Sequence, residues 1–426
     1  MTAPIILVIL ILFSLLASGT WIFIALIGTG VLSLELLRDL PVERLLAPNL
    51  LSSTSTSSLL VLPLFILMAE ILFRSKLSQL LFEGLTPFAS LFPGRLLHAN
   101  VMGCTLFAAT CGSSAATTLT VGRVTYNELL DRGYDKGLAM GSLAGPGTLG
   151  LLIPPSTVLI VYGVLSDTSI LQLFLSGFVP GLILATLFSG YVALAAKLRP
   201  ERVPEEATRY RLNDIGGGLL KVSPVVGLVF VIMGSMYLGV ATPTETATFG
   251  VLGAIVISAA QKSLSWQALT EALKATAMTS SMLGLIIGAA VFLSTAFGFL
   301  GIPQSVAQYL GPIAQSPFLL IIVLLLFYIL LGCFLEGISM LVMTLPVVLP
   351  LVLAAGFDPV WFGIFLVIVI EMAQITPPLG FNLFVLQNLT GEKLGRIVKS
   401  VFPFFLIMCG FVVLITIFPQ IAMFGV

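Results

Sequence analysis

Two Pro-Pro pairs interrupt long apolar segments, and they are the features of this sequence with the clearest chemical potential. The first lies in residues 147–156 (GTLGLLIPPS) and the second in residues 374–380 (QITPPLG). Proline lacks a backbone donor and clashes with the carbonyl four residues earlier, so two in succession break a helix. We therefore expect the carbonyl oxygens of Gly150, Ile153 and Thr376 to lose their helical partners. Such oxygens suit a hard monovalent cation, whereas the plain alternative is a kink satisfied by neighbouring side chains.

Two further apolar segments are interrupted near their middles by small or polar residues. Residues 108–118 read AATCGSSAATT, and small residues let backbones approach closely, although tight packing alone would also explain them. The counterpart, residues 332–337 (GCFLEG), contains Glu336, and an ionisable residue inside a membrane segment is a functional candidate. Helix N-termini at both interruptions would offer partial positive charge to an anionic substrate. The residues expected to line that substrate site are Gly112, Ser113, Ser114, Glu336 and Gly337.

The other titratable side chains offer fewer candidates. Glu245 follows Pro243 in the sequence ATPTE, which suits the first turn of a helix, so we favour a capping role. Glu70 and Glu371 lie within long apolar segments and could form hydrogen bonds between helices. The single histidine, His98, is expected at the membrane interface. The four cysteines have no CxxC spacing, which suggests neither a zinc site nor a disulfide framework.

The composition places most of the molecular surface in lipid. Hydrophobic residues make up 58% of the 426, only 9% are charged, and the mean hydropathy is +1.14. A soluble domain carries roughly 25% charged residues because its surface faces water. The formal net charge is zero, which argues against nucleic-acid binding. We therefore predict an all-α integral membrane protein that crosses the bilayer several times.

A membrane helix needs about 20 mostly apolar residues, and the sequence offers many such segments. The predicted spans are residues 3–18, 20–36, 58–73, 76–92, 138–164, 170–197, 222–240, 244–260, 276–300, 361–386 and 401–424. We interpret residues 96–124 and 319–355 as re-entrant hairpins that turn back within the membrane. The segments 138–164 and 361–386 are expected to be the broken helices that contain the Pro-Pro pairs.

The two halves of the chain repeat with a shift of 223 residues. This shift carries residues 133–135 (GYD) onto 356–358 (GFD) and Pro154-Pro155 onto Pro377-Pro378. The basic segment Lys197–Lys221 separates the halves, and the positive-inside rule places it in the cytoplasm. Paired interrupted segments in two halves indicate the binding site of a secondary transporter. We predict one repeat in residues 1–215 and a second, inverted one in residues 216–426.

These features also carry a family resemblance. The chain resembles the large membrane subunit, of the DctM and SiaM type, of a tripartite ATP-independent periplasmic (TRAP) transporter. The matching motifs are PLFIL from Pro63 with Glu70, Asn100, Gly112-Ser113, Arg132-Gly133-Tyr134, residues 150–156, ATPTE from Ala241, Thr376-Pro377-Pro378 and Asn382-Leu383-Phe384. They span nearly the whole chain in one order.

The resemblance implies an inverted-repeat, elevator-type transporter with two re-entrant helical hairpins. It implies a non-enzymatic symporter in the bacterial inner membrane, with sodium as the coupling ion and no cofactor. The implied cargo is a small organic anion, a carboxylate such as a dicarboxylate or a sulfonate. The implied partners are a small membrane subunit (DctQ type) and a periplasmic substrate-binding protein (DctP type). The positions that match the family's sodium sites are Ala108, Cys111, Gly150, Ile153 and Pro155 in one half and Gly332, Thr376 and Pro378 in the other.

Some residues depart from the family pattern. The usual Ser-Gly-Ser tip is here Cys111-Gly112-Ser113, an expected Asp is Thr117, and Glu336 stands where Asp is usual. These departures prevent a transfer of substrate identity. The alternative function is a proton-coupled carrier that uses Glu70, Glu336 or Glu371. An intramembrane enzyme would need a paired nucleophile and base, or two facing aspartates, and the sequence favours neither this class nor an ion channel.

Overall fold

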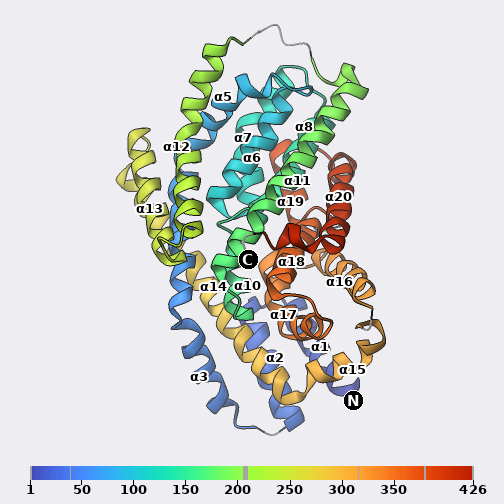
Figure 1. Ribbon diagram of the computed structural model, residues 1–426. Helices are drawn as coiled ribbons and strands as arrows, with labels where there is room; N and C mark the ends of the chain where they lie inside the picture. The colour runs from blue at the N-terminus through green and yellow to red at the C-terminus, as the bar shows by residue number, and fades with distance from the viewer. Residues whose placement is uncertain (1, 39, 205–209, 315, 379, 425–426) are drawn as a thin grey trace.

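The computed structural model describes residues 2–38, 40–204, 210–314, 316–378 and 380–424, and within these ranges every regular element is a helix (Figure 1). The helices before the basic segment are α1 (Thr2–Ala17), α2 (Ile22–Arg38), α3 (Val42–Thr54), η1 (Ser57–Leu60), α4 (Val61–Phe73), α5 (Leu77–Ala89), α6 (Leu96–Cys111), α7 (Ser114–Asp131), α8 (Lys136–Gly147), α9 (Leu149–Leu152), α10 (Thr157–Ser166), α11 (Ile170–Leu198) and η2 (Pro200–Arg202). Those after it are α12 (Leu212–Tyr237), α13 (Pro243–Ala260), α14 (Trp266–Leu300), α15 (Ile302–Ala314), α16 (Pro317–Gly332), α17 (Gly337–Ala354), α18 (Pro359–Gln374), α19 (Phe381–Thr390), α20 (Leu394–Ile417) and η3 (Pro419–Ala422).

Length and composition make this a multi-pass membrane protein. Among the described residues, seven helical segments are long and apolar enough to cross a bilayer, and α3 with α4 form an eighth, bent by 53°. Large apolar side chains such as Leu220 and Phe230 are each 75% exposed. Exposed apolar surface on this scale needs lipid around it, because soluble monomers rarely present large apolar patches to water. The expected all-α integral membrane class is confirmed.

Two helical hairpins occupy opposite parts of the molecule. The first, α6 and α7, turns at Gly112, whose φ of 60° is the left-handed conformation that glycine adopts without strain. The second, α16 and α17, turns just before Glu336, the N-cap residue of α17. In Figure 1, α6 and α7 lie in the upper part of the view and α17 in the lower part. Both helical hairpins are confirmed, although α7 continues to Asp131, beyond the predicted end at residue 124, and their re-entry into the membrane stays a prediction.

The repeated aspartates, Asp135 and Asp358, are N-cap residues at equivalent positions in the two halves. Asp135 accepts a backbone hydrogen bond as the N-cap of α8, and Asp358 does so as the N-cap of α18. The glycines two residues earlier, Gly133 and Gly356, have φ values of 85° and 87°. Matching caps 223 residues apart start the two broken helices in the same way. The division of the chain into residues 1–215 and 216–426 stays a prediction.

The broken helices form the centre of the packed core. The predicted segment 138–164 consists of α8, α9 and α10, and the predicted segment 361–386 consists of α18 and α19. The Pro-Pro peptide bond at each break is cis. Every side chain of α18 from Val360 to Gln374 is buried. Within it, Trp361 stacks on Phe357 and Phe365 at centroid distances of 4.7 and 5.5 Å, and its Nε1 donates to Ile415 O at 2.9 Å.

The predicted span at residues 76–92 is wrong. Helix α5 has 13 residues, which at 1.5 Å per residue reach about 20 Å, short of a hydrocarbon core of about 30 Å. It packs along α12, where Glu83 accepts from Lys221 Nζ at 2.8 Å. Helices α3 and α15 were not predicted. Three helices also begin earlier than predicted: α12 at Leu212 instead of residue 222, α14 at Trp266 instead of 276, and α20 at Leu394 instead of 401.

Candidate functional site

The tip of the first hairpin touches the first broken helix backbone to backbone. A Cβ atom built on Gly150 would lie 2.5 Å from Ser113 O and 2.7 Å from Ser114 N. One turn earlier, a Cβ on Gly147 would lie 2.0 Å from Thr118 Oγ1, and Ser114 Oγ donates to Gly147 O at 3.2 Å. Only glycine permits this approach. The sequence-predicted residues Gly150, Ser113 and Ser114 are therefore brought together.

The other side of the same tip meets the start of α10. A Cβ on Gly112 would lie 2.6 Å from Pro155 O, and Thr157 Oγ1 donates to Gly112 O at 2.9 Å. Asn382 Nδ2, from α19 in the second half, donates to Ser114 Oγ. Segments from both halves therefore enclose the tip. The contacts that Thr157 and Asn382 make with it were not predicted from the sequence. The Asn382-Leu383-Phe384 motif was the available signal for the latter.

The first break leaves carbonyl oxygens without their usual donors. Pro154 and Pro155 have no N–H to donate to Gly150 O and Leu151 O, the carbonyls four residues before them. Leu151 O is served instead by Ser156 Oγ. Ile153 O accepts no hydrogen bond from the described residues. Among the expected cation ligands, Ala108 O accepts from Gly112 N at 3.1 Å, so it is occupied, and Cys111 is the last residue of α6 beside the tip.

The second break differs from the expectation. The carbonyl of Thr376 was expected to be free, yet it accepts from Gly380 N at 3.0 Å. Ala373 O likewise accepts from Thr376 N at 3.1 Å. That part of the prediction is wrong. The Thr376 hydroxyl donates its hydrogen to Met372 O at 2.7 Å, which leaves its lone pairs available, and Pro378 is exposed.

The second hairpin approaches its broken helix as closely as the first. A Cβ on Gly332 would lie 2.0 Å from Ala373 Cβ, and Cys333 Sγ donates to Pro377 O at 3.3 Å. Gly150 of the first half corresponds to Ala373 by the 223-residue shift. The close contact therefore needs a glycine on the broken helix in one half and on the hairpin in the other.

Glu336 caps its own helix. Its Oε2 accepts from Ile338 N at 3.1 Å and from Ser339 N at 3.4 Å. The carboxylate thus neutralises the helix N-terminus that was expected to attract an anionic substrate. The neighbouring Gly337 is better placed, since a Cβ there would lie 2.8 Å from Gln374 Nε2 and 3.7 Å from Leu151 Cδ1. Gly337 therefore lies where the two broken helices meet.

Glu371 joins the two broken helices in the buried core. Its side chain is 1% exposed, and its Oε1 accepts from Leu151 N at 2.9 Å across 220 residues of sequence. Its Oε2 has no partner among the described residues. This bond occupies an amide at the first break, immediately after Gly150. Glu371 is thus a positioning residue for the first candidate cation site.

Replacing Glu371 separates this positioning role from proton transport. Glu371→Leu leaves the Leu151 amide unsatisfied, which is expected to lower the free energy of unfolding by about 1–3 kcal/mol. Glu371→Gln keeps an oxygen acceptor, so stability and uptake should both stay near the wild-type values. Thermal unfolding in detergent and uptake into proteoliposomes measure the two quantities. Loss of uptake in a stable Glu371→Gln protein would instead support the proton-coupled alternative.

The remaining titratable candidates are engaged elsewhere. Glu70 forms an ion pair with Arg74. Glu245 forms a capping box with Thr242, in which its Oε2 accepts from Thr242 N at 2.8 Å, so the expected capping role is confirmed. His98 is bonded to Ser189 Oγ and Pro93 O, both at 2.7 Å. Within the described ranges, no group of three or more His, Cys, Asp or Glu side chains is placed to hold a metal. A cation at the breaks would need backbone and hydroxyl oxygens.

A hydroxyl-rich hollow of about 1210 Å³ lies at the start of α11. Its hydroxyl groups come from Ser52, Ser53, Thr56, Ser57, Ser58, Thr168, Ser169, Thr242 and Thr244. Sequence reasoning missed it, although the run SSTSTSS at residues 52–58 was a signal. Helix α11 has 29 residues and is about 44 Å long, so the hollow and the basic segment lie at opposite ends of it.

Known proteins similar to this chain match it over most of its length. A family model described as "Tripartite ATP-independent periplasmic transporter, DctM component" matches residues 9–421. The C4-dicarboxylate TRAP transporter large permease protein DctM of Pseudomonas aeruginosa is 30% identical over 381 residues, covering 89% of this chain and 88% of the relative. An ectoine/5-hydroxyectoine TRAP transporter large permease protein from Ruegeria pomeroyi is 30% identical over 400 residues, covering 93% and 92%.

The fold is also similar to a solved structure, that of the Alcanivorax borkumensis YdaH transporter. The TM-score is 0.57 with 15% sequence identity, and the match covers 88% of this chain and 87% of the other. At this identity the likeness concerns the fold alone. It agrees with the all-α membrane fold class expected from the sequence.

Proposed function

The chain belongs to the DctM component family of tripartite ATP-independent periplasmic transporters, and from this premise we propose that it carries a small organic anion into the cell, driven by a sodium gradient. The resemblance seen in the sequence is therefore confirmed at the level of the family. Sodium coupling, the substrate and the partners are the proposed elements.

The observation that carries sodium coupling is the first break. There, Gly150 lies in contact with the hairpin tip, and Pro154 cannot donate to its carbonyl oxygen. Backbone carbonyls at the ends of broken membrane helices are the ligands that transporters use for sodium. We place the first sodium ion among the oxygens of this break and the tip, with Gly150, Ile153 and Pro155 as its ligands. The second site, near Gly332, Thr376 and Pro378, is supported by the Thr376 hydroxyl lone pairs more than by free carbonyls.

For the substrate we propose an organic acid with a carboxylate or sulfonate group. Relatives are named for C4-dicarboxylates, ectoine, isethionate and sialic acid. Ser113 at the start of α7 supplies a hydroxyl and a positive helix end, and Gly337 lies near both breaks. Ser114 holds the tip in place, since its hydroxyl donates to Gly147 O. The hairpins and broken helices would move as one transport domain, since the Glu371–Leu151 bond ties the two halves together.

The proposed function includes two partners, a small membrane subunit and a periplasmic binding protein. The hydroxyl-rich hollow lies opposite the segment predicted to be cytoplasmic, so it faces the side from which a binding protein would deliver substrate. An inner-membrane location is part of the same proposal.

Reconstitution tests this function. Proteoliposomes containing this chain are assayed with a panel of labelled succinate, ectoine, isethionate and sialic acid, under an inward sodium gradient. We expect uptake of one panel member only when both partners are present, and background uptake when either is omitted. Full uptake by this chain alone would contradict the three-component function. Failure of the complete system to take up any organic acid would contradict the substrate class.

A further inference from the structure

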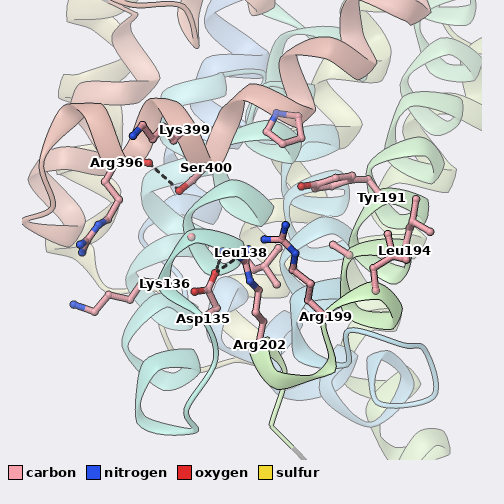
Figure 2. Close-up of a pocket in the computed structure, with 14 residues that line it drawn as sticks. Asp135, Lys136, Leu138, Tyr191, Leu194, Arg199, Arg202, Arg396, Lys399 and Ser400 are labelled. Carbon is pink, nitrogen blue, oxygen red and sulfur yellow. Dashed lines mark hydrogen bonds and ion pairs between the residues drawn. The ribbon is translucent and has the colours of Figure 1, made fainter.

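A basic groove of about 740 Å³ lies at the end of the molecule where α11 stops, away from both breaks (Figure 2). It is bounded by the start of α8, the end of α11 with η2, and the first turns of α20. The residues lining it are Asp135, Lys136, Gly137, Leu138, Tyr191, Leu194, Ala195, Leu198, Arg199, Arg202, Arg396, Lys399, Ser400 and Pro403. Helix α8 separates it from the hairpin tip, because Lys136 and Gly147 lie eleven residues, or about 16 Å, apart along that helix.

The groove carries an excess of positive charge. Its lining contains five cationic side chains and one carboxylate. That carboxylate, Asp135, lies 4.0 Å from Arg202, and the neighbouring Glu392 is shared between Lys136 at 2.9 Å and Arg396 at 2.8 Å. The hydrogen bond from Lys136 lowers the pKa of the Glu392 carboxyl. Among the described residues, these two carboxylates are too few to balance the five cations.

Two of the cations have no partner of their own. Within the described part of the chain, Arg199 and Lys399 take part in no ion pair and no side-chain hydrogen bond. They come from opposite walls, Arg199 from the end of α11 and Lys399 from α20. Figure 2 shows Arg199 and Arg202 extending into the groove toward α20, and Tyr191 directed inward from α11. In the same view Lys399 extends outward from α20 at the rim of the groove. Guanidinium and ammonium groups at one opening suit a phosphate.

The wall beside these cations is apolar and exposed. Leu194 and Leu198 are 54% and 72% exposed, and both lie on α11, a helix that is apolar enough to cross a membrane. Pro403 and Tyr191 continue this surface. A small free anion would make no favourable contact with this apolar wall, whereas the acyl chains of a lipid would pack against it. The groove also adjoins the segment predicted to be cytoplasmic, where anionic lipids attract basic side chains.

We propose that this groove binds an anionic phospholipid of the cytoplasmic leaflet, with its phosphate at the basic opening lined by Arg199 and Lys399 and its acyl chains along Leu194 and Leu198. The phosphate chemistry alone would also suit a free phosphate ester. The apolar wall on the lipid-facing side of α11 distinguishes the two sources.

Lipid binding to the purified full-length chain tests the proposal. After delipidation in a neutral detergent, native mass spectrometry compares phosphatidylglycerol, phosphatidylcholine and glycerol 3-phosphate. We expect phosphatidylglycerol to bind at least tenfold more tightly than phosphatidylcholine, and glycerol 3-phosphate not to displace it at equal concentration. Equal binding of the two lipids would overturn the proposal, and displacement by glycerol 3-phosphate would point to a free-anion site instead.

Matched variants locate the bound lipid. The variant Arg199→Gln/Lys399→Gln removes two unpaired cations and should weaken phosphatidylglycerol binding by roughly tenfold to thirtyfold, at about 1 kcal/mol per charge. The control variant Lys262→Gln/Lys274→Gln removes two exposed lysines near the α13–α14 connection and should leave binding unchanged. An equal loss in both variants would show non-specific attraction and overturn the assignment. The wild-type lipid comparison stands even if the groove variant is unstable.

Discussion

Replacing sodium by potassium at constant ionic strength should reduce uptake by the reconstituted complex to background. The physical reason lies at the first break, where Pro154 cannot donate to Gly150 O and Ile153 O accepts no hydrogen bond from the described residues. A small cation held by several such oxygens stabilises the break and the hairpin tip together. The expected result is uptake that follows the sodium gradient and stops when the gradient is dissipated. Equal uptake in potassium would reject sodium coupling, and uptake driven by a proton gradient alone would favour the proton-coupled alternative.

Sodium binding can also be followed without substrate. A ligand at ten times its Kd stabilises the folded state by about 1.4 kcal/mol, so sodium chloride should raise the unfolding midpoint relative to potassium chloride. Thr376→Val tests the second site, because it deletes a hydroxyl whose lone pairs are free. Thr416→Val is the matched control, since both hydroxyls donate to the carbonyl four residues earlier at 2.7 Å. We expect a weaker sodium response in Thr376→Val only. Identical sodium titrations for the two variants would remove the Thr376 hydroxyl from the site.

Gly150→Ala should reduce the rate of uptake by about a hundredfold. The added methyl group would lie 2.5 Å from Ser113 O and 2.6 Å from Ser113 C, and both are backbone atoms that cannot rotate away. The hairpin tip must therefore move by about 1 Å, and a misplacement of this size in a positioned site costs roughly a hundredfold in rate. Overpacking adds a destabilisation of about 1–3 kcal/mol. The rate of uptake and the sodium-induced rise in the unfolding midpoint should both fall.

A second glycine provides the control for Gly150→Ala. Nothing lies within 4 Å of a Cβ built on Gly284 in α14, so Gly284→Ala should fold and transport normally, with the small gain in helix propensity that alanine brings. If Gly150→Ala transported at the wild-type rate, the close contact between tip and broken helix would have no role in transport. If it failed to fold, the sodium response of Thr376→Val would still test the proposed mechanism.

Much of the fold could be predicted from the sequence because membrane helices must satisfy their own backbones. A long apolar segment in lipid must form a helix, because only a helix satisfies all its backbone hydrogen bonds within the segment. Hydropathy alone therefore found α11, α14 and α20, although α14 and α20 begin earlier than expected. Prolines and small residues mark where a helix is interrupted, and they revealed the hairpins and the breaks. The reasoning failed where helices are short. Residues 76–92 were read as a span, and α3 and α15 were missed, because a helix of 13 residues has no distinctive hydropathy.

The sequence by itself determined which segments are interrupted and which residue types stand at the interruptions, since these depend on local backbone chemistry. Only the tertiary structure decided what those residues touch. It showed that Thr376 O is bonded to Gly380 N and that Glu336 caps its own helix, because both outcomes depend on how the chain turns back in space. It also brought Glu371 to the Leu151 amide, 220 residues away in sequence, and gathered Arg199 and Lys399 into one groove. Contacts of this range depend on the packing of both halves, which no local pattern encodes.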